Sequence, residues 1–146
     1  MRVYLDACSL QRPLDDRSQP RVNLEAEAVL TILRLVENGE LTLVSSEALE
    51  VEVDHTPDAQ RRAAARDVLK LASQTLRLGE EVESDAAAFI RSGVKPLDAL
   101  HLAFASRADV EYFCTCDDKL RKKAQKLRSL KTTAVTPLEL VLKVVS

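Results

Sequence analysis

Residues 1–10 are MRVYLDACSL, a short apolar segment that runs directly into an aspartate. Val3, Tyr4 and Leu5 predict a buried strand, because short apolar runs with β-branched and aromatic residues are typical of strands inside a sheet. Asp6 then falls where this strand leaves the sheet. An aspartate is disfavoured inside a strand but suits a strand end or a helix cap, so Asp6 has both a structural and a functional interpretation.

Helix and strand patterns alternate along the rest of the chain. Pro57 is expected to open a helix, and Leu97, Leu100 and Phe104 are expected to face inward on another. The predicted helices cover 24–36, 47–54, 57–72, 80–92, 96–107, 118–126 and 137–144, and the predicted strands cover 41–44, 75–78, 111–115 and 132–135. This alternation predicts an α/β fold, a three-layer sandwich around a central, mostly parallel sheet.

The composition fits a single domain over residues 1–146, with 46% hydrophobic residues, 30% charged residues and a net charge of −2. These values exclude a disordered chain and a uniformly basic nucleic-acid-coating surface. Arg2 and Asp6 come too early for a signal peptide, and every apolar run is shorter than the roughly 18 residues of a membrane helix. We therefore expect a soluble, cytoplasmic protein without a membrane partner.

Several common site classes lack their sequence signals. With only three glycines, the chain has neither a phosphate-binding P-loop nor a dinucleotide fingerprint. Cys8, Cys114 and Cys116 are an odd number of cysteines, which predicts reduced thiols rather than a disulfide framework. A zinc site that combines them with His101 is an alternative, although C-x-C is an unusual ligand spacing.

Acidic residues gather at the predicted carboxyl ends of the strands, where open parallel sheets bind their ligands. They are Asp6, Glu47, Glu50, Glu52, Asp54, Asp98, Asp117 and Asp118. Carboxylates that lie together without basic partners repel one another unless a cation is bound, so this arrangement suggests a divalent metal site. Taken singly, Asp98 and Asp117 are equally well explained as helix-capping residues.

The helix over 47–54 offers a choice between several acids. Glu47, Glu50 and Asp54 share one stripe at helical spacing, which predicts a solvated face. Glu52 falls beside apolar positions and is expected to turn toward the fold. A carboxylate on an inward-leaning face needs a partner, so Glu52 is the better candidate ligand.

Four segments of the chain resemble the acidic blocks of a known family. They are YLDAC at 4–8, SSEALEVEV at 45–53, KPLDALHLAFA at 95–105 and CTCDD at 114–118. In this order they resemble the blocks of PIN-domain ribonucleases, especially the small VapC-like toxins of toxin–antitoxin pairs. The resemblance spans the whole chain, and it implies that Asp6, Glu52, Asp98 and Asp117 are the catalytic, metal-binding acids.

The resemblance also implies roles for the neighbours of these acids. Thr115 matches the threonine of the family's threonine-x-aspartate pair, and Asp118 and Glu50 are alternates to their neighbouring acids. Cys8 departs from the family, many members of which carry Ser, Thr or Asn two residues after the first aspartate. His101 lies three residues after Asp98 and is expected to be a core residue or a partner of the ligands rather than a ligand.

The activity implied is that of a metal-dependent endoribonuclease. One or two Mg²⁺ or Mn²⁺ ions held by the four acids would activate water for in-line attack on an RNA phosphodiester. The family also implies a protein antitoxin and a homodimer, for which the apolar helices near 24–36 and 68–71 are candidate surfaces. The alternative is a non-catalytic PIN-like module that binds RNA or protein.

A basic segment directly follows the last acids. Residues 119–131, KLRKKAQKLRSLK, contain seven basic residues and no acid. Such a run is either a solvated helix face or a phosphate-binding surface, and its place beside the predicted metal edge favours RNA binding. The candidate RNA-binding residues are Lys119, Arg121, Lys122, Lys123, Lys126 and Arg12, with Arg17 and Arg21 as an extension of the same surface.

Overall fold

A five-stranded parallel sheet forms the centre of the computed structural model, which describes residues 1–145. Its strands are β1 (Arg2–Leu5), β2 (Thr42–Ser46), β3 (Gln74–Leu76), β4 (Tyr112–Cys114) and β5 (Thr133–Val135), and their order in the sheet is β3-β2-β1-β4-β5. Every neighbouring pair is parallel. The predicted α/β fold is therefore confirmed, with a sheet that is parallel throughout.

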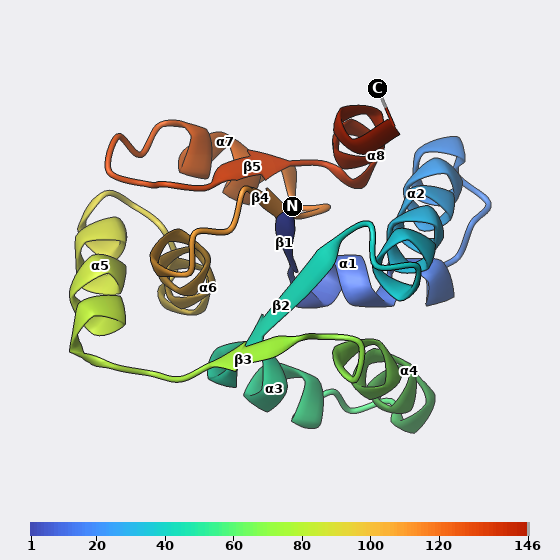
Figure 1. Cartoon of the computed structure of the whole chain (residues 1–146), viewed down its shortest axis with the longest axis horizontal. Helices are drawn as coiled ribbons and strands as arrows, with labels where there is room; N and C mark the ends of the chain where they lie inside the picture. Colours follow the sequence, from blue (N-terminus) through green and yellow to red (C-terminus); the bar gives the residue numbers. More distant parts are fainter. Residues whose placement is uncertain (146) are drawn as a thin grey trace.

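Helices cover both faces of the sheet (Figure 1). On one side α2 (Pro20–Glu37) packs against α8 (Pro137–Val145), and on the other α5 (Glu80–Arg91) packs against α6 (Pro96–Arg107). The remaining helices are α1 (Ala7–Gln11), α3 (Glu47–Asp54), α4 (Ala59–Leu69) and α7 (Asp118–Gln125), with a short 3₁₀ turn, η1, at Arg12–Leu14. These layers confirm the predicted sandwich.

Two local predictions were wrong, and two short elements had not been predicted. Residues 7–14 form these elements, α1 and η1, and Asp6 caps α1 by accepting the Ser9 N–H. Pro57 does not open α4, since Asp58 is its cap and accepts the Arg61 N–H. Leu97 does not face inward: it is 44% exposed, beside Lys95 and Pro96, which are exposed as well.

The core sits between the sheet and its two helical layers. Tyr4, Phe113 and Phe104 are among its largest fully buried side chains, and the Tyr4 and Phe113 rings stack at a centroid distance of 5.4 Å. Because β1 and β4 are central and covered on both faces, their side chains are apolar almost throughout. Among residues 1–145, no helix combines the length and the hydropathy needed to span a bilayer.

Candidate metal and nucleic-acid site

The carboxyl ends of β1 and β4 lie side by side and carry the first and last acidic segments. Leu5 is in register with Cys114, and the Asp6 N–H donates to the Cys114 carbonyl at 3.2 Å. The chain therefore leaves the sheet at the same edge at Asp6 and at Thr115. Strand order reverses on either side of β1, which is where open α/β sheets bind their ligands.

Asp6 is a buried carboxylate, 6% exposed, at the N-terminus of α1. Its Oδ1 accepts hydrogen bonds from the Ser9 N–H and the Cys8 thiol, each at 3.0 Å. Burial raises the pKa of Asp6 above its usual range, and these donors, together with Thr115, partly oppose the rise. The Cys8 thiol is therefore one of the two donors that this oxygen accepts from.

Thr115 connects the first acid to the last. The Thr115 hydroxyl lowers the pKa of Asp6, and its Oγ1 accepts the Asp117 N–H at 3.0 Å. Asp117 in turn caps α7, since its Oδ1 accepts the N–H groups of Lys119 and Leu120 at 2.9 and 3.1 Å. One buried hydroxyl thereby fixes the backbone that carries Asp117 relative to Asp6.

Asp98 lies in the first turn of α6, and the charges of the other three acids affect its pKa. Partial burial raises its pKa most, and the negative charges of Asp117, Asp6 and Glu52 raise it further, while His101 opposes the rise. An acid pKa rises beside other acids because like charges disfavour ionisation. The charges of the other three predicted acids therefore all contribute to the raised pKa of Asp98.

Glu52 differs from the other acids of α3 in its contacts. Its Oε1 lies 2.8 Å from Nε2 of His101, and its side chain is 32% exposed. On the outer stripe, Glu47 and the alternate Glu50 have side chains 41% and 42% exposed and lie 3.8 and 3.9 Å from Arg77. Glu52 alone of these three glutamates bonds to a buried residue of another helix.

The donors at this edge fit a hard divalent cation that keeps much of its water. Within residues 1–145, no three His, Cys, Asp or Glu side chains lie close enough together to hold one ion directly. Mg²⁺ is commonly bound through one or two carboxylates with several waters retained, and oxygen donors are those that it prefers. The same result means that the described cysteines and histidines form no preorganised zinc site.

Asp118, the alternate to Asp117, is held by two arginines. Its carboxylate lies 2.7 Å from both Nη atoms of Arg21 and 2.7 Å from Nη1 of Arg121. These hydrogen bonds lower the pKa of Asp118 well below its usual range. The two guanidinium groups already neutralise the Asp118 carboxylate and weaken its attraction for a cation. Asp117 is therefore the better candidate metal ligand of the two acids.

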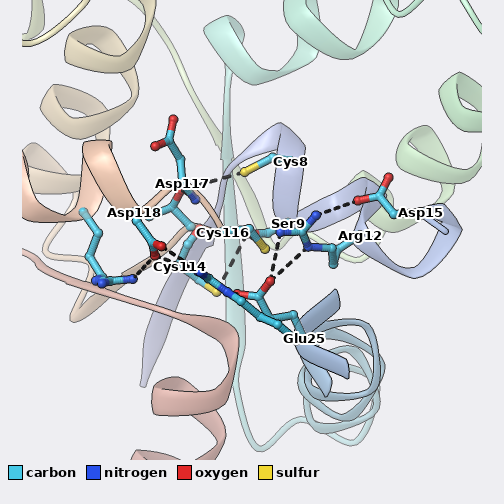
Figure 2. A network of polar contacts seen from close by, with 12 residues as sticks. Cys8, Ser9, Arg12, Asp15, Glu25, Cys114, Cys116, Asp117 and Asp118 are labelled. Atoms are coloured by element: carbon cyan, nitrogen blue, oxygen red, sulfur yellow. Dashed lines mark hydrogen bonds and ion pairs between the residues drawn. The ribbon is translucent and has the colours of Figure 1, made fainter. Parts of the chain in front are cut away.

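Arg12 lies in a buried ion-pair network (Figure 2). Its guanidinium contacts Oε1 of Glu25 at 2.9 and 3.2 Å and Oδ2 of Asp15 at 2.9 Å. Glu25 is 1% exposed, an unusual burial for a carboxylate, and Arg21 adds a longer contact at 3.6 Å. Arg17 similarly pairs with Glu27 at 2.8 Å. The charges of these three arginines are therefore already engaged by carboxylates.

The lysines of α7 differ from these arginines in their exposure and in their lack of ion pairs within the described part of the chain. Lys119, Lys122, Lys123 and Lys126 are exposed, and none of their ammonium groups forms an ion pair with residues 1–145. Lys123, Lys126 and Arg128 also line a cavity of about 540 Å³ between the ends of α5 and α7. The basic segment thus runs from the Asp117 cap at one end of α7 to a cationic hollow at the other.

An apolar groove of about 710 Å³ adjoins the acids on the α3 side. Val51, Leu97 and Leu78 line it and are 56%, 44% and 46% exposed, while Glu52 lies at its border. Exposed apolar side chains gathered in one groove are typical of an interaction surface. The groove is lined by α1, α3, α6 and the segment after β3.

Two residues that hold the site together were not identified from the sequence. Tyr4 and Ser46 are fully buried, and the Tyr4 hydroxyl lies 2.6 Å from Nδ1 of His101 and 2.7 Å from Oγ of Ser46. The available signal was the tyrosine itself, because a buried phenol on a central strand needs a hydrogen-bond partner. The sequence does not show which of the distant polar residues supplies it.

Comparison with known proteins agrees with this geometry. The family model of the PIN domain matches residues 3–126. No curated protein matches the sequence. A chain in the crystal structure of VapBC2 from Rickettsia felis bound to a DNA fragment from their promoter has the same fold, with a TM-score of 0.60 and 11% sequence identity over 92% of this chain and 99% of that one. The protein described here belongs to the PIN-domain family.

Proposed function

We propose that the protein is a divalent-metal-dependent endoribonuclease and the toxin of a toxin–antitoxin pair. The observation that carries the proposal is that the ends of β1 and β4 lie side by side, so that Asp6 and Asp117 leave the sheet at one edge; the raised pKa of Asp98, to which Asp117, Asp6 and Glu52 contribute, supports it. Asp6 and Asp117 also cap α1 and α7, but carboxylates that converge without basic partners cost stability. A bound cation accounts for the arrangement.

Each of the four acids has a definable task in this proposal. Asp6 and Asp117, joined through Thr115, and Asp98 and Glu52 would hold Mg²⁺ or Mn²⁺ directly or through water. When bound, such an ion supplies an activated water and charge stabilisation for phosphodiester hydrolysis. Membership of the PIN family, whose members are typically nucleases, supports the same reaction class.

The RNA backbone would follow α7. The unpaired lysines of this helix extend from the Asp117 cap to the cavity lined by Lys123, Lys126 and Arg128. Phosphate binding by such lysines is electrostatic and largely independent of base sequence. The chain has only three phenylalanines, two tyrosines and no tryptophan, so base stacking contributes little to this mode of binding.

A protein antitoxin would cover the apolar groove that borders Glu52. The fold likeness to a chain of the VapBC2 structure supports such a partner, and the exposed Val51, Leu78 and Leu97 supply a surface for it. We further propose a homodimer in the cytoplasm, for which Leu24 on α2 is 54% exposed. Light scattering at high concentration tests the dimer, and a strictly monomeric species would contradict it.

RNA cleavage across metal conditions tests the activity. We expect a panel of structured and single-stranded RNAs to be cut in Mg²⁺ or Mn²⁺ but not in EDTA, and Asp6→Asn to be inactive in every condition. Glu47→Gln, on the outer stripe of α3, serves as the matched acid-to-amide control and should cleave like the parent. RNA binding without cleavage by the metal-loaded parent would instead indicate the non-catalytic PIN-like module.

A further inference from the structure

Four polar groups form a continuous buried hydrogen-bond chain that ends on Glu52. The Leu49 N–H donates to Ser46 Oγ at 3.1 Å, and Ser46 Oγ lies 2.7 Å from the Tyr4 hydroxyl. The Tyr4 hydroxyl lies 2.6 Å from Nδ1 of His101, whose Nε2 lies 2.8 Å from Oε1 of Glu52. The chain thus joins β1, the end of β2, α3 and α6.

The two ends of this chain fix its direction. A backbone N–H can only donate, and an ionised carboxylate can only accept. With a neutral imidazole, Nε2–H must therefore donate to Glu52 and Nδ1 must accept from the Tyr4 O–H. The Tyr4 oxygen is then free to accept from the Ser46 O–H, so that every donor in the chain has one acceptor.

Burial of these side chains favours this arrangement of donors and acceptors over the opposite imidazole tautomer. Tyr4 and Ser46 are 0% exposed and His101 is 2% exposed, so water does not compete for their hydrogen bonds. A mispaired buried donor costs about 1–3 kcal/mol, which disfavours the opposite imidazole tautomer because it would turn a bare nitrogen toward the carboxylate. Among residues 1–145, Oε1 is the only carboxylate oxygen of Glu52 with a hydrogen bond, and Oε2 remains available.

We propose that Ser46 and Tyr4, acting through the Nε2–H tautomer of His101, are positioning residues that orient the Glu52 carboxylate so that Oε2 faces a divalent cation. The orientation of a ligand carboxylate is set by the hydrogen bond to its other oxygen, and removing such a partner typically lowers metal affinity about 10–100-fold. The cation part of this inference rests on the proposed function, whereas the tautomer part does not.

The protein contains an internal reference for the tautomer of His101. Its second histidine, His55, has Nδ1 2.8 Å from the carbonyl oxygen of Val51. A carbonyl only accepts, so His55 must carry its proton on Nδ1 when it is neutral. The two histidines are therefore expected to hold opposite tautomers in the same molecule.

Long-range ¹H–¹⁵N correlation spectra of the metal-free protein test the first part. At about pH 8 we expect the Nε2–H pattern for His101 and the Nδ1–H pattern for His55. Tyr4→Phe removes the donor to Nδ1 of His101, so the Nδ1 resonance of His101 should shift while the Nε2–H pattern and the His55 resonances stay unchanged. An Nδ1–H pattern for His101 in the parent would overturn the proposal, whether or not the protein cleaves RNA.

Mn²⁺ titration tests the second part without using activity. We expect Tyr4→Phe to bind Mn²⁺ about tenfold more weakly than the parent, within the range for partners of ligating groups. His101→Gln, whose amide can still donate to Glu52, should retain more affinity than His101→Leu. Parent-like Mn²⁺ affinity in both Tyr4→Phe and His101→Leu would overturn the positioning role.

Ser106→Ala separates positioning from general loss of stability. Ser106 is buried on the same helix as His101 and accepts the Lys131 N–H at 3.0 Å, away from the acids. The variant should lower the melting temperature as Tyr4→Phe does while keeping the parent's Mn²⁺ affinity. An equal loss of affinity in Ser106→Ala would show that the effect of Tyr4→Phe is merely structural.

Discussion

Glu52 and His101 lie 49 residues apart in the chain, yet Oε1 of one is 2.8 Å from Nε2 of the other. This contact joins α3 to α6. It distinguishes Glu52 from the two glutamates on the outer stripe of α3. Glu47 and Glu50 on that stripe have only long contacts with the exposed Arg77. The acids of α3 should therefore differ sharply in their effect on activity.

Amide substitutions of the four site acids should abolish metal-dependent RNA cleavage. Asp6→Asn, Glu52→Gln, Asp98→Asn and Asp117→Asn should each lower the cleavage rate by more than about 100-fold, because losing a ligand should exceed the 10–100-fold effect of losing a ligand's hydrogen-bond partner. Glu47→Gln and Glu50→Gln are the controls and should stay near the parent rate. Loss of cleavage in Glu50→Gln with retention in Glu52→Gln would show that Glu50 is the ligand.

The stability of the metal-free protein should fall as the pH rises from acid toward neutral because of Asp6 and Asp98. Burial raises both pKa values, so the folded state holds protons that the unfolded chain releases above the ordinary aspartate pKa of about 3.9. The penalty grows between that value and the raised pKa values and is fully present above them.

Thermal denaturation in EDTA from about pH 4 to pH 8 measures this penalty. Asp6→Asn lacks one titrating group and, because asparagine caps helices well, keeps the start of α1. Its melting temperature should decline less with pH than that of the parent. Asp118, whose pKa is lowered, contributes in the opposite direction but equally in both proteins. Identical pH profiles would count against a destabilising charge at Asp6.

Arg12→Ala should destabilise the fold rather than affect RNA binding selectively. The substitution leaves Glu25 buried without its closest cation, and breaking a buried ion pair on one side typically costs about 3–5 kcal/mol. Urea denaturation measures the loss. Arg17→Ala is the control, because its partner Glu27 is 58% exposed and such pairs contribute about 1 kcal/mol or less. Equal stability of the two variants would refute the structural role of Arg12.

Neutralising Lys122, Lys123 and Lys126 together should weaken RNA binding without changing metal affinity. Each phosphate contact on a single strand contributes about 0.7 to the slope of log affinity against log salt, so losing three should reduce the slope by about 2. Filter binding in Ca²⁺ with the Asp6→Asn protein as background measures affinity without turnover. Lys143→Gln on α8 is a control for net charge, and an unchanged slope in the triple variant would mean that α7 is a solvated face.

The sequence by itself determined the architecture. Apolar periodicity and helix-terminating residues are local signals, and they located α3 and α6 at the bounds found in the structure, 47–54 and 96–107. The alternation of strands and helices then required a parallel sheet, because parallel strands need crossovers. The acids that follow β1 and β4, Asp6 and Asp117, were visible as a pattern, whereas the full set with Glu52 and Asp98 came from the family resemblance. Residues 7–14 were missed because a helix of five residues, α1, is too short to show periodicity.

Only the tertiary structure decided which polar groups meet. The pairing of Arg12 with Glu25, of Asp118 with Arg21, and of Tyr4 with His101 joins residues on different elements, and no local spacing encodes such contacts. Desolvation also depends on the assembled fold, so the raised pKa of Asp6 could not be inferred from its neighbours in the chain. Local sequence preferences thus determine the helices and strands. Burial and long-range packing determine the pKa values, ion pairs and hydrogen bonds of the site.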